Sequence, residues 1–231
     1  MNLQVIARIH TPFQDKFGIP RQSGLVQGCQ STIVFEEPYR VEEALRGIEQ
    51  YSHLWLLFIF DRNHQTGWSP TVRPPRLGGN QRMGVFATRS PFRPNPIGLS
   101  SVRLLKVRRT AEYGLVLDVD GADLADGTPI VDIKPYLAYV DAHADARDGF
   151  AGEVREKALE VDFPEALLQL IPENQRQAVL GILAQDIRPG YHHDADRVYG
   201  FTYDHRNIRF SVENDCVHVL RVEEEKQSGN N

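Results

Sequence analysis

Hydrophobic and polar positions in the first ~140 residues fall into short runs bounded by turn-forming residues, which is the pattern of β-strands. Each run is rich in Val, Ile, Leu, Phe or Trp. The runs cover residues 3–9, 31–37, 53–60, 82–88, 101–107 and 114–121. Only residues 41–51 have helical spacing, with Val41, Leu45 and Ile48 on one side. Many short strands with few helices predict a mainly β protein whose first part is an antiparallel barrel or sandwich.

The pattern changes in the last third of the chain. Two helices are expected over residues 164–171 and 173–186, because Pro164 and Pro172 stand where the first turn of a helix accepts proline. Residues 197–225 then alternate apolar and polar positions around two turns, as in a three-stranded antiparallel meander. This mixture predicts a small α+β domain.

A short segment separates the two patterns. Residues 142–153 are small and polar, which favours a linker. We therefore expect a β-barrel domain over 1–141, a linker over 142–153 and an α+β domain over 154–231, with a solvated tail from 223 onward.

Composition limits the classes of function. The chain has 231 residues and a net charge of −5, and its 26 basic residues are 21 arginines and five lysines. Arginines gather between residues 73 and 109, which favours a local anion-binding face on an acidic body. Arg103, Arg108 and Arg109 are expected to pair with surface acids instead.

Other features exclude whole classes of protein. No run approaches the ~18 apolar residues that a membrane span needs, and residues 1–13 lack the layout of a signal peptide, so we expect a cytoplasmic protein without a membrane partner. Cys29 and Cys216 lie far apart without metal-ligand spacing, and His192 and His193 have no second ligand cluster, so no metal site is expected.

The strongest candidate for chemistry is the segment RPPRLGGNQRMGVFATRSPFRPNPIGLS, residues 73–100. It contains five arginines, five prolines and four glycines. Prolines stiffen a loop, and glycines let the backbone approach a ligand closely. Ordered loops longer than roughly 12 to 15 residues are uncommon unless they are functional, so this composition predicts a binding site.

Two further stretches have a similar composition. Residues 17–26, FGIPRQSGLV, carry a proline, an arginine, a glutamine and a glycine between apolar ends. Residues 124–141 contain the tight turn Asp126–Pro129, followed by Asp132 and Lys134, which a strand would direct to the same face.

With PRQSGLV, the 73–100 segment and DGTPIVDIKPYL, the chain resembles the TrmO (YaeB) family of tRNA methyltransferases over essentially its full length. The resemblance implies an S-adenosylmethionine-dependent enzyme that methylates N6 of N6-threonylcarbamoyladenosine beside the tRNA anticodon. It also implies a barrel outside the Rossmann methyltransferases, a homodimer, and a cofactor near the subunit interface. The implied partner is the anticodon stem-loop of tRNA.

The same resemblance implies the cofactor-binding residues, and the chemistry of the expected substrates suggests the RNA-binding residues and the general bases. The expected cofactor-binding residues are Pro20, Arg21, Gln22, Asp61, Arg62, Arg89, Leu99, Asp126, Gly127, Thr128 and Pro129. The expected RNA-binding residues are Arg73, Arg76, Arg93, Asn95, Lys134 and Tyr136. Asp126 and Asp132 are the candidate general bases. Related members can carry Phe-His-Gln where this chain has Phe60, Asp61 and Arg62.

Two alternatives remain at this point. The arginine-rich segment is also compatible with an RNA-binding module that has no methyl donor. A second alternative keeps the fold and the methyl donor but has another RNA or a small metabolite as the acceptor.

Overall fold

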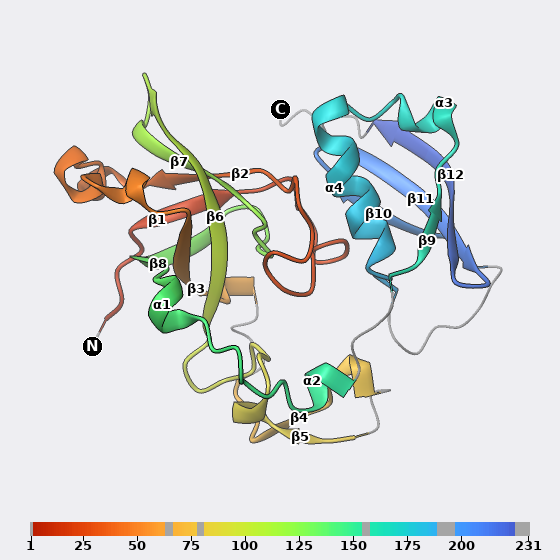
Figure 1. The fold of residues 1–231 in the computed structure, drawn as a ribbon, viewed down its shortest axis with the longest axis horizontal. Coiled ribbons are helices and arrows are strands. Elements are labelled where there is room, and N and C mark those ends of the chain that lie inside the picture. The colour runs from red at the N-terminus through yellow and green to blue at the C-terminus, as the bar shows by residue number, and fades with distance from the viewer. Residues whose placement is uncertain (1, 63–66, 78–80, 154–157, 189–196, 225–231) are drawn as a thin grey trace.

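A computed structural model describes residues 2–62, 67–77, 81–153, 158–188 and 197–224. Six antiparallel strands form one sheet in the order β1-β2-β7-β6-β3-β8, and β8 pairs with β1 as well as β3, so the sheet closes into a barrel (Figure 1). The strands are β1 (Ala7–His10), β2 (Ser31–Phe35), β3 (His53–Ile59), β6 (Ile97–Thr110), β7 (Gly114–Asp120) and β8 (Thr128–Pro135). The prediction of a mainly β chain is confirmed.

Alternation along the strands fills the barrel. In β3, Leu54, Leu56 and Phe58 point inward and are buried, while His53 and Trp55 point outward. The start of β6 passes so close to the Phe58 ring that a Cβ on Gly98 would lie 2.1 Å from a ring atom. Glycine is therefore required at this position of the GLS run, which the sequence pattern had left outside the strand.

The helix expected over 41–51 is wrong. The segment instead forms two short 3₁₀ turns, η2 (Glu42–Leu45) and η3 (Ile48–Gln50), after η1 (Glu37–Tyr39). Gly47 separates η2 from η3 with φ 87°, a left-handed conformation that ends the first turn.

The strand expected over 82–88 is also wrong for most of its length. Only β5 (Met83–Gly84) is extended, where it pairs with β4 (Thr71–Val72), and η6 (Val85–Ala87) follows. Another 3₁₀ turn, η5 (Pro75–Leu77), lies in the same segment. The residues around the arginines therefore form a folded loop below the barrel (Figure 1).

The last third of the chain forms a second sheet, as predicted. β10 (Tyr199–Tyr203), β11 (Arg206–Glu213) and β12 (Cys216–Glu224) form the expected meander. β9 (Glu160–Asp162) adds an unexpected fourth strand parallel to β12. Both turns of the meander use residues with positive φ, from 45° to 64°, as two-residue hairpins require. The tail begins later than expected, because β12 continues to Glu224.

Two helices lie near this sheet. α4 (Glu173–Ala184) confirms the longer predicted helix, and α3 (Glu165–Leu168) is a shorter version of the other. Two further helices are short. α1 (Ala138–Asp141) lies directly before the expected linker, and α2 (Phe150–Glu153) lies at its end. The division into domains stays a prediction.

The second core contains residues from the beginning of the chain. Phe13, Val26 and Cys29, from the segment between β1 and β2, pack among the buried residues of α4 and the second sheet. Burial, with a contribution from nearby Asp120, raises the pKa of the Cys29 thiol to about 12. Both cysteines are free. The segment between β1 and β2 therefore joins the barrel to the second core.

Within the described ranges, no helix has the length and apolar character that a membrane span needs, and no cluster of three metal-ligating side chains is found. His192 and His193 lie outside these ranges.

Candidate functional site

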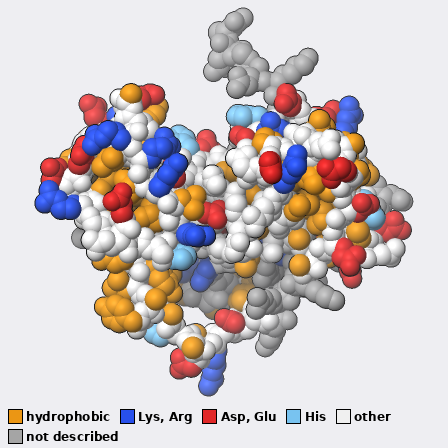
Figure 2. Space-filling model, turned by 45° about the horizontal axis from the view of Figure 1, so that its top comes forward, with side chains coloured by type: hydrophobic (Ala, Val, Ile, Leu, Met, Phe, Trp, Pro, Cys, Tyr) orange, Lys and Arg blue, Asp and Glu red, His pale blue; other side chains and the backbone are white. Residues whose placement is uncertain are grey.

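A cavity of about 990 Å³, which we call the cationic cavity, lies beside the folded arginine loop. Its walls come from residues 16–22, from residues 69–75, 82 and 88–92, from Phe150, and from residues 187–188 between α4 and β10. Its cationic side chains are Lys16, Arg21, Arg73, Arg82, Arg89 and Arg188. Among the described residues, no aspartate or glutamate lines it. Such a surface attracts anions, although acidic side chains are spread over both lobes of the face drawn in Figure 2 and the net charge is −5.

Hydrogen bonds hold the walls together. Arg89 donates from Nη1 to the side-chain oxygen of Gln22, which links the arginine loop to the 17–26 segment. Arg21 Nη2 donates to the carbonyl oxygen of Asp186 at 2.6 Å. The Asp186 carboxylate in turn accepts two 2.7 Å hydrogen bonds from Arg188. The barrel side and the second-sheet side of the cavity are therefore directly connected.

Arg93 is directed into its own loop. Its Nη1 lies 2.7 Å from the carbonyl oxygen of Thr88, 3.2 Å from that of Val85 and 3.4 Å from that of Ser90. These contacts stabilise the loop, and a contact of Arg93 with RNA stays a prediction. Arg76 lies in η5 and Asn95 is exposed before β6.

A second, smaller cavity of about 430 Å³ opens on the outer face of the barrel; we call it the aromatic slot. Its lining residues are Ser23, His53, Trp55, Arg89, Leu99, Ser101 and Tyr136. Because Arg89 lines this cavity as well as the large one, the two cavities meet at its side chain.

Asp123 lies close enough to Arg89 to feel its charge. This partly buried carboxylate accepts a hydrogen bond from Ser100 Oγ at 2.5 Å and another from the backbone N–H of Ser23. Desolvation by burial raises its pKa, while the hydrogen bonds and the charge of Arg89 act in the opposite direction. An acid with a raised pKa beside an arginine is a candidate functional group.

The turn Asp126–Pro129 lies next to Arg62. Arg62 donates to the carbonyl oxygens of Gln14 and Asp126 at 2.8 and 2.7 Å, and Thr128 is buried at the start of β8. Asp61 is exposed beside it. The sequence-predicted cofactor residues thus form two groups in one chain, one around Asp126–Pro129 and one around Arg89 with Arg21, Gln22 and Leu99. Pro20 is buried at the edge of the second group.

The two candidate bases are held by polar partners. Asp126 Oδ1 accepts from the Thr11 N–H at 3.0 Å and lies 3.4 Å from His10 Nδ1. Asp132 forms a 2.7 Å ion pair with Lys134, which confirms that these two side chains share one face of the strand. Neither acid is among the described residues that line the two cavities.

The arginines at the far end of β6 are surface residues. Arg108 forms hydrogen bonds with Asp118 at 2.8 and 3.0 Å, and Arg109 pairs with Glu42, as expected. No ion pair of Arg103 is found in the described part of the chain, so that part of the expectation is wrong.

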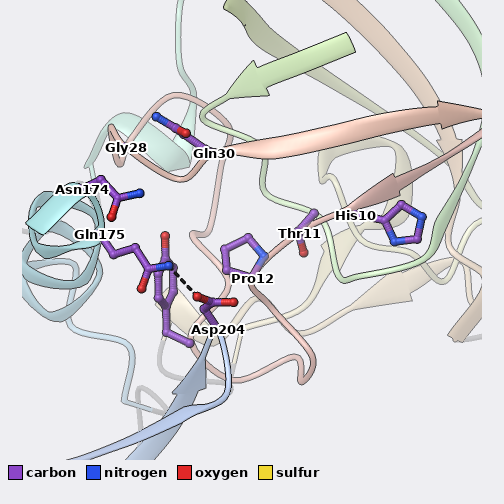
Figure 3. A pocket seen from close by; sticks show the side chains of 9 residues that line it. His10, Thr11, Pro12, Gly28, Gln30, Asn174, Gln175 and Asp204 are labelled. Atoms are coloured by element: carbon purple, nitrogen blue, oxygen red, sulfur yellow. Dashed lines mark hydrogen bonds between the residues drawn. The ribbon is translucent and has the colours of Figure 1, made fainter. Parts of the chain in front are cut away.

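A third cavity of about 270 Å³ separates the barrel from α4 (Figure 3). Gln175 reaches Asp204 there, and the His10 ring lies beyond Thr11 and Pro12. The Nε2 of Gln175 donates to Asp204, and the backbone N–H of Asp204 donates to the carbonyl oxygen of Pro12 at 3.0 Å. These bonds position the segment after β1 against the second sheet, and hence position Lys16 and Arg21 further along it.

Comparisons with known proteins decide the family. The model of the tRNA-methyltransferase O N-terminal domain matches residues 8–142, and that of the TrmO C-terminal domain matches residues 156–225. The chain belongs to the TrmO family. It is 42% identical to the tRNA (adenine(37)-N6)-methyltransferase of Escherichia coli, over 94% of this chain and 96% of that protein.

Two further relatives of this TrmO-family chain come from Pseudomonas aeruginosa. A putative S-adenosylmethionine-dependent methyltransferase, RcsF, is 44% identical over 94% of this chain and 95% of its own length. A crystal structure of TrmO superposes with a TM-score of 0.76 and 35% identity, covering 96% of this chain and 98% of that one.

Several site residues of this TrmO-family chain were missed in the sequence. Trp55 and His53 belong to an apolar strand whose outward positions looked like ordinary sheet residues. Asp123 stands in a GADLAD run without a motif of its own. Alternation of inward and outward positions along β3 could have identified Trp55. An outward Trp between inward leucines leaves a large ring outside the core.

Proposed function

We propose that this protein transfers a methyl group from S-adenosylmethionine to N6 of adenosine 37 of tRNA, next to the anticodon, and that the acceptor carries the N6-threonylcarbamoyl group. The observation that carries the proposal is the cavity with six cationic side chains, built from the two sequence stretches that are typical of the TrmO family. The names of the relatives support the reaction type and the adenosine.

The side chains around Arg89 fit the proposed cofactor. Guanidinium groups of Arg21 and Arg89 suit a carboxylate, because their planar N–H groups can bind both oxygens. Leu99 supplies an apolar wall, and Ser23 and Ser101 supply hydroxyl groups. When bound, S-adenosylmethionine supplies an electrophilic methyl group. Pro20, Gln22 and the Asp126–Pro129 group complete the proposed cofactor-binding set, together with Asp61 and Arg62.

The chain's own residues would bind and orient the RNA. Arg73 lines the cationic cavity and is exposed, so it is available to phosphate oxygens. The other proposed RNA contacts are Arg76, Arg93, Asn95, Lys134 and Tyr136. Holding the acceptor base in a fixed orientation lowers the barrier by removing the entropy cost of alignment. Asp126 and Asp132 remain the proposed acceptors of the N6 proton.

We further propose that two copies assemble, and that the barrel binds the cofactor in place of a Rossmann sheet. The support is a set of exposed apolar side chains that includes Leu99 of the second group of cofactor residues: Leu99, Tyr139 and Val140 are 54%, 86% and 50% exposed. Large exposed apolar side chains mark association surfaces. Since tRNA is the proposed substrate, we place the reaction in the cytoplasm.

Mass spectrometry of nucleosides from a deletion strain tests the function. We expect N6-methylated threonylcarbamoyladenosine to disappear from tRNA and to return with the wild-type gene, but not with an Arg89→Ala gene. Purified protein with S-adenosylmethionine should restore the methyl group in vitro. An unchanged nucleoside profile in the deletion strain would overturn the proposed acceptor.

Binding measurements separate the two alternatives. Calorimetric binding of S-adenosylmethionine to the purified protein excludes an RNA-binding module without a donor. Binding of the donor without methylation of tRNA would favour a methyltransferase with another acceptor.

A further inference from the structure

We propose that the aromatic slot is a purine-binding site, in which Trp55 and Tyr136 form the stacking surface. This inference rests on the proposed function, because both S-adenosylmethionine and the anticodon loop carry purine rings. It assigns a ligand to His53 and Trp55, for which no sequence pattern predicted a binding role.

The strand register places Trp55 on the outer wall of the barrel. Trp55 lies directly between Ser101 of β6 and Lys134 of β8, and its inward neighbours Leu54 and Leu56 are fully buried. Its ring is partly exposed. A large aromatic side chain in this position does not fill the core, so its surface is available to a ligand.

The ring of Trp55 is held in one orientation. Nε1 donates to Asp141 Oδ2 at 2.9 Å, and the same oxygen accepts from the Leu137 N–H at 2.8 Å. These two hydrogen bonds lower the pKa of Asp141 and keep it ionised, and the bond from the Leu137 N–H has the larger effect. A ring fixed in this way loses little entropy when a base stacks on it.

Tyr136 stands beside Trp55 without covering it. The two ring centroids lie 5.3 Å apart with planes tilted by 45°, and the His53 ring lies 6.1 Å from Tyr136 at 59°. The three rings are therefore not stacked on one another. The cavity of about 430 Å³ lies within the ~300–1,000 Å³ range of small-ligand sites.

The rest of the slot suits the polar edge of a purine. Ser23 and Ser101 can each donate and accept a hydrogen bond, as the ring nitrogens and the amino group of adenine require. Arg89 stands at the border with the cationic cavity, where a phosphate or carboxylate attached to the purine would lie. A ligand with a flat heterocycle and an anionic group fits this arrangement.

Tryptophan fluorescence gives a direct test, because the chain has only two tryptophans, Trp55 and Trp68. In a Trp68→Phe variant, Trp55 is the only tryptophan. The variant is titrated with S-adenosylhomocysteine, and separately with an anticodon stem-loop RNA that carries threonylcarbamoyladenosine. Calorimetry on the same samples measures binding independently. The matched control is Trp55→Phe, in which only Trp68 reports.

We expect quenching and a spectral shift in Trp68→Phe that is lost in Trp55→Phe. Quenching by S-adenosylhomocysteine identifies the adenine of the cofactor as the stacked ring, and quenching by RNA alone identifies an RNA base. Absence of quenching by either ligand overturns the inference. The proposed function fails separately, if the wild-type protein does not methylate tRNA.

A second series tests stacking without fluorescence. Trp55→Leu should weaken binding of the stacked ligand by roughly 5- to 150-fold, the range for loss of one base–aromatic contact. Trp55→Phe, which keeps a ring but loses the bond to Asp141, should retain more affinity than Trp55→Leu. Equal affinity of Trp55→Leu and wild type for both ligands, with a changed melting temperature, would assign Trp55 a structural role only.

Discussion

Ser100 of β6 donates a hydrogen bond of 2.5 Å from its hydroxyl group to the carboxylate of Asp123. Ser100 is 3% exposed, and the carboxylate of Asp123 also accepts the N–H of Ser23 from the PRQSGLV stretch. Because Arg89 acts on the same carboxylate, Asp123 connects the barrel to two loops that line both cavities. We therefore predict that Asp123 helps to position Arg89.

Asp123→Asn should reduce activity without unfolding the protein. The amide has the same shape but no charge, so Arg89 loses a counter-charge. The hydrogen bond from Ser100 then goes to a neutral oxygen. A hydrogen bond to a charged group exceeds one to a neutral group by about 1 kcal/mol, so we expect kcat/KM to fall by roughly fivefold. Steady-state methyl transfer to tRNA measures this. An unchanged kcat/KM would show that Asp123 does not position Arg89.

The raised pKa of Asp123 predicts that its contribution to folding stability decreases as the pH rises. Desolvation raises the folded-state pKa of Asp123 above its ordinary 3.8, so the folded protein holds this proton more tightly than the unfolded chain. Its contribution to stability is therefore greatest below pH 3.8 and declines as the pH rises through the higher folded pKa. Asp123→Asn should remove that decline, and urea unfolding across acidic pH measures it.

Asp118 is the matched control. The hydrogen bond from Arg108 is the main cause of its lowered pKa, so its contribution to stability is present above pH 3.8 and is lost as the pH falls through the folded pKa. Asp118→Asn should therefore change the pH profile in the opposite direction and leave kcat/KM unchanged. The same pH profile for both variants would contradict this assignment.

Arg89→Ala should remove most of the methyl transfer activity. The fold should survive, because the side chain is exposed and borders both cavities. Loss of a charged partner of this kind costs about 2 kcal/mol or more, which is roughly 30-fold in kcat/KM. Arg89→Lys keeps the charge but loses the planar donor pair, so it should recover only part of the activity. Wild-type turnover of Arg89→Ala, with an unchanged circular dichroism spectrum, would refute the role of Arg89.

The cationic cavity predicts a specific salt dependence. If Arg73 and Arg82 each bind one phosphate, the single Ala variants should each lower the slope of log K against log salt by roughly 0.7 to 0.9. Binding of tRNA by fluorescence anisotropy at several salt concentrations measures the slope. Arg109→Ala, which removes a surface partner of Glu42, should leave it unchanged. A slope equal to that of wild type in both cavity variants would exclude direct phosphate contacts.

Local patterning predicted most strands of the barrel and the meander, but not the segments that depend on distant contacts. The alternation in β3 marks its inward leucines directly, and the turn residues of the second sheet identify its hairpins. The helix expected at 41–51 fails because Gly47 adopts a left-handed conformation inside an apparently helical pattern. β9 was missed because its three residues become a strand only by pairing with β12.

The candidate site residues were likewise predictable only where a local motif marks them. Family motifs selected Arg21, Gln22 and Arg89, which the structure brings together. No local signal relates Asp123 to Ser100, 23 residues away. Contacts of this kind arise when a closed sheet places separate strands side by side, and a linear pattern does not contain them.

Phe13 provides the test of how the two cores are connected. Its ring is fully buried in the second core, 5.6 Å from the Tyr203 ring in an edge-to-face arrangement, although it belongs to the segment that follows β1. Phe13→Ala should lower the free energy of unfolding by about 3 to 5 kcal/mol, the usual cost of removing a buried phenylalanine. Urea unfolding followed by circular dichroism measures this loss.

Leu170→Ala is the control, since this side chain is 52% exposed in the same part of the molecule and should change stability by no more than ~0.5 kcal/mol. Because Phe13 ties the 11–30 segment to the second sheet, its loss should also release Lys16 and Arg21 from the cationic cavity and weaken binding of tRNA. A destabilised Phe13→Ala protein that binds tRNA as tightly as wild type, under conditions where it remains folded, would show that the cavity does not depend on this connection.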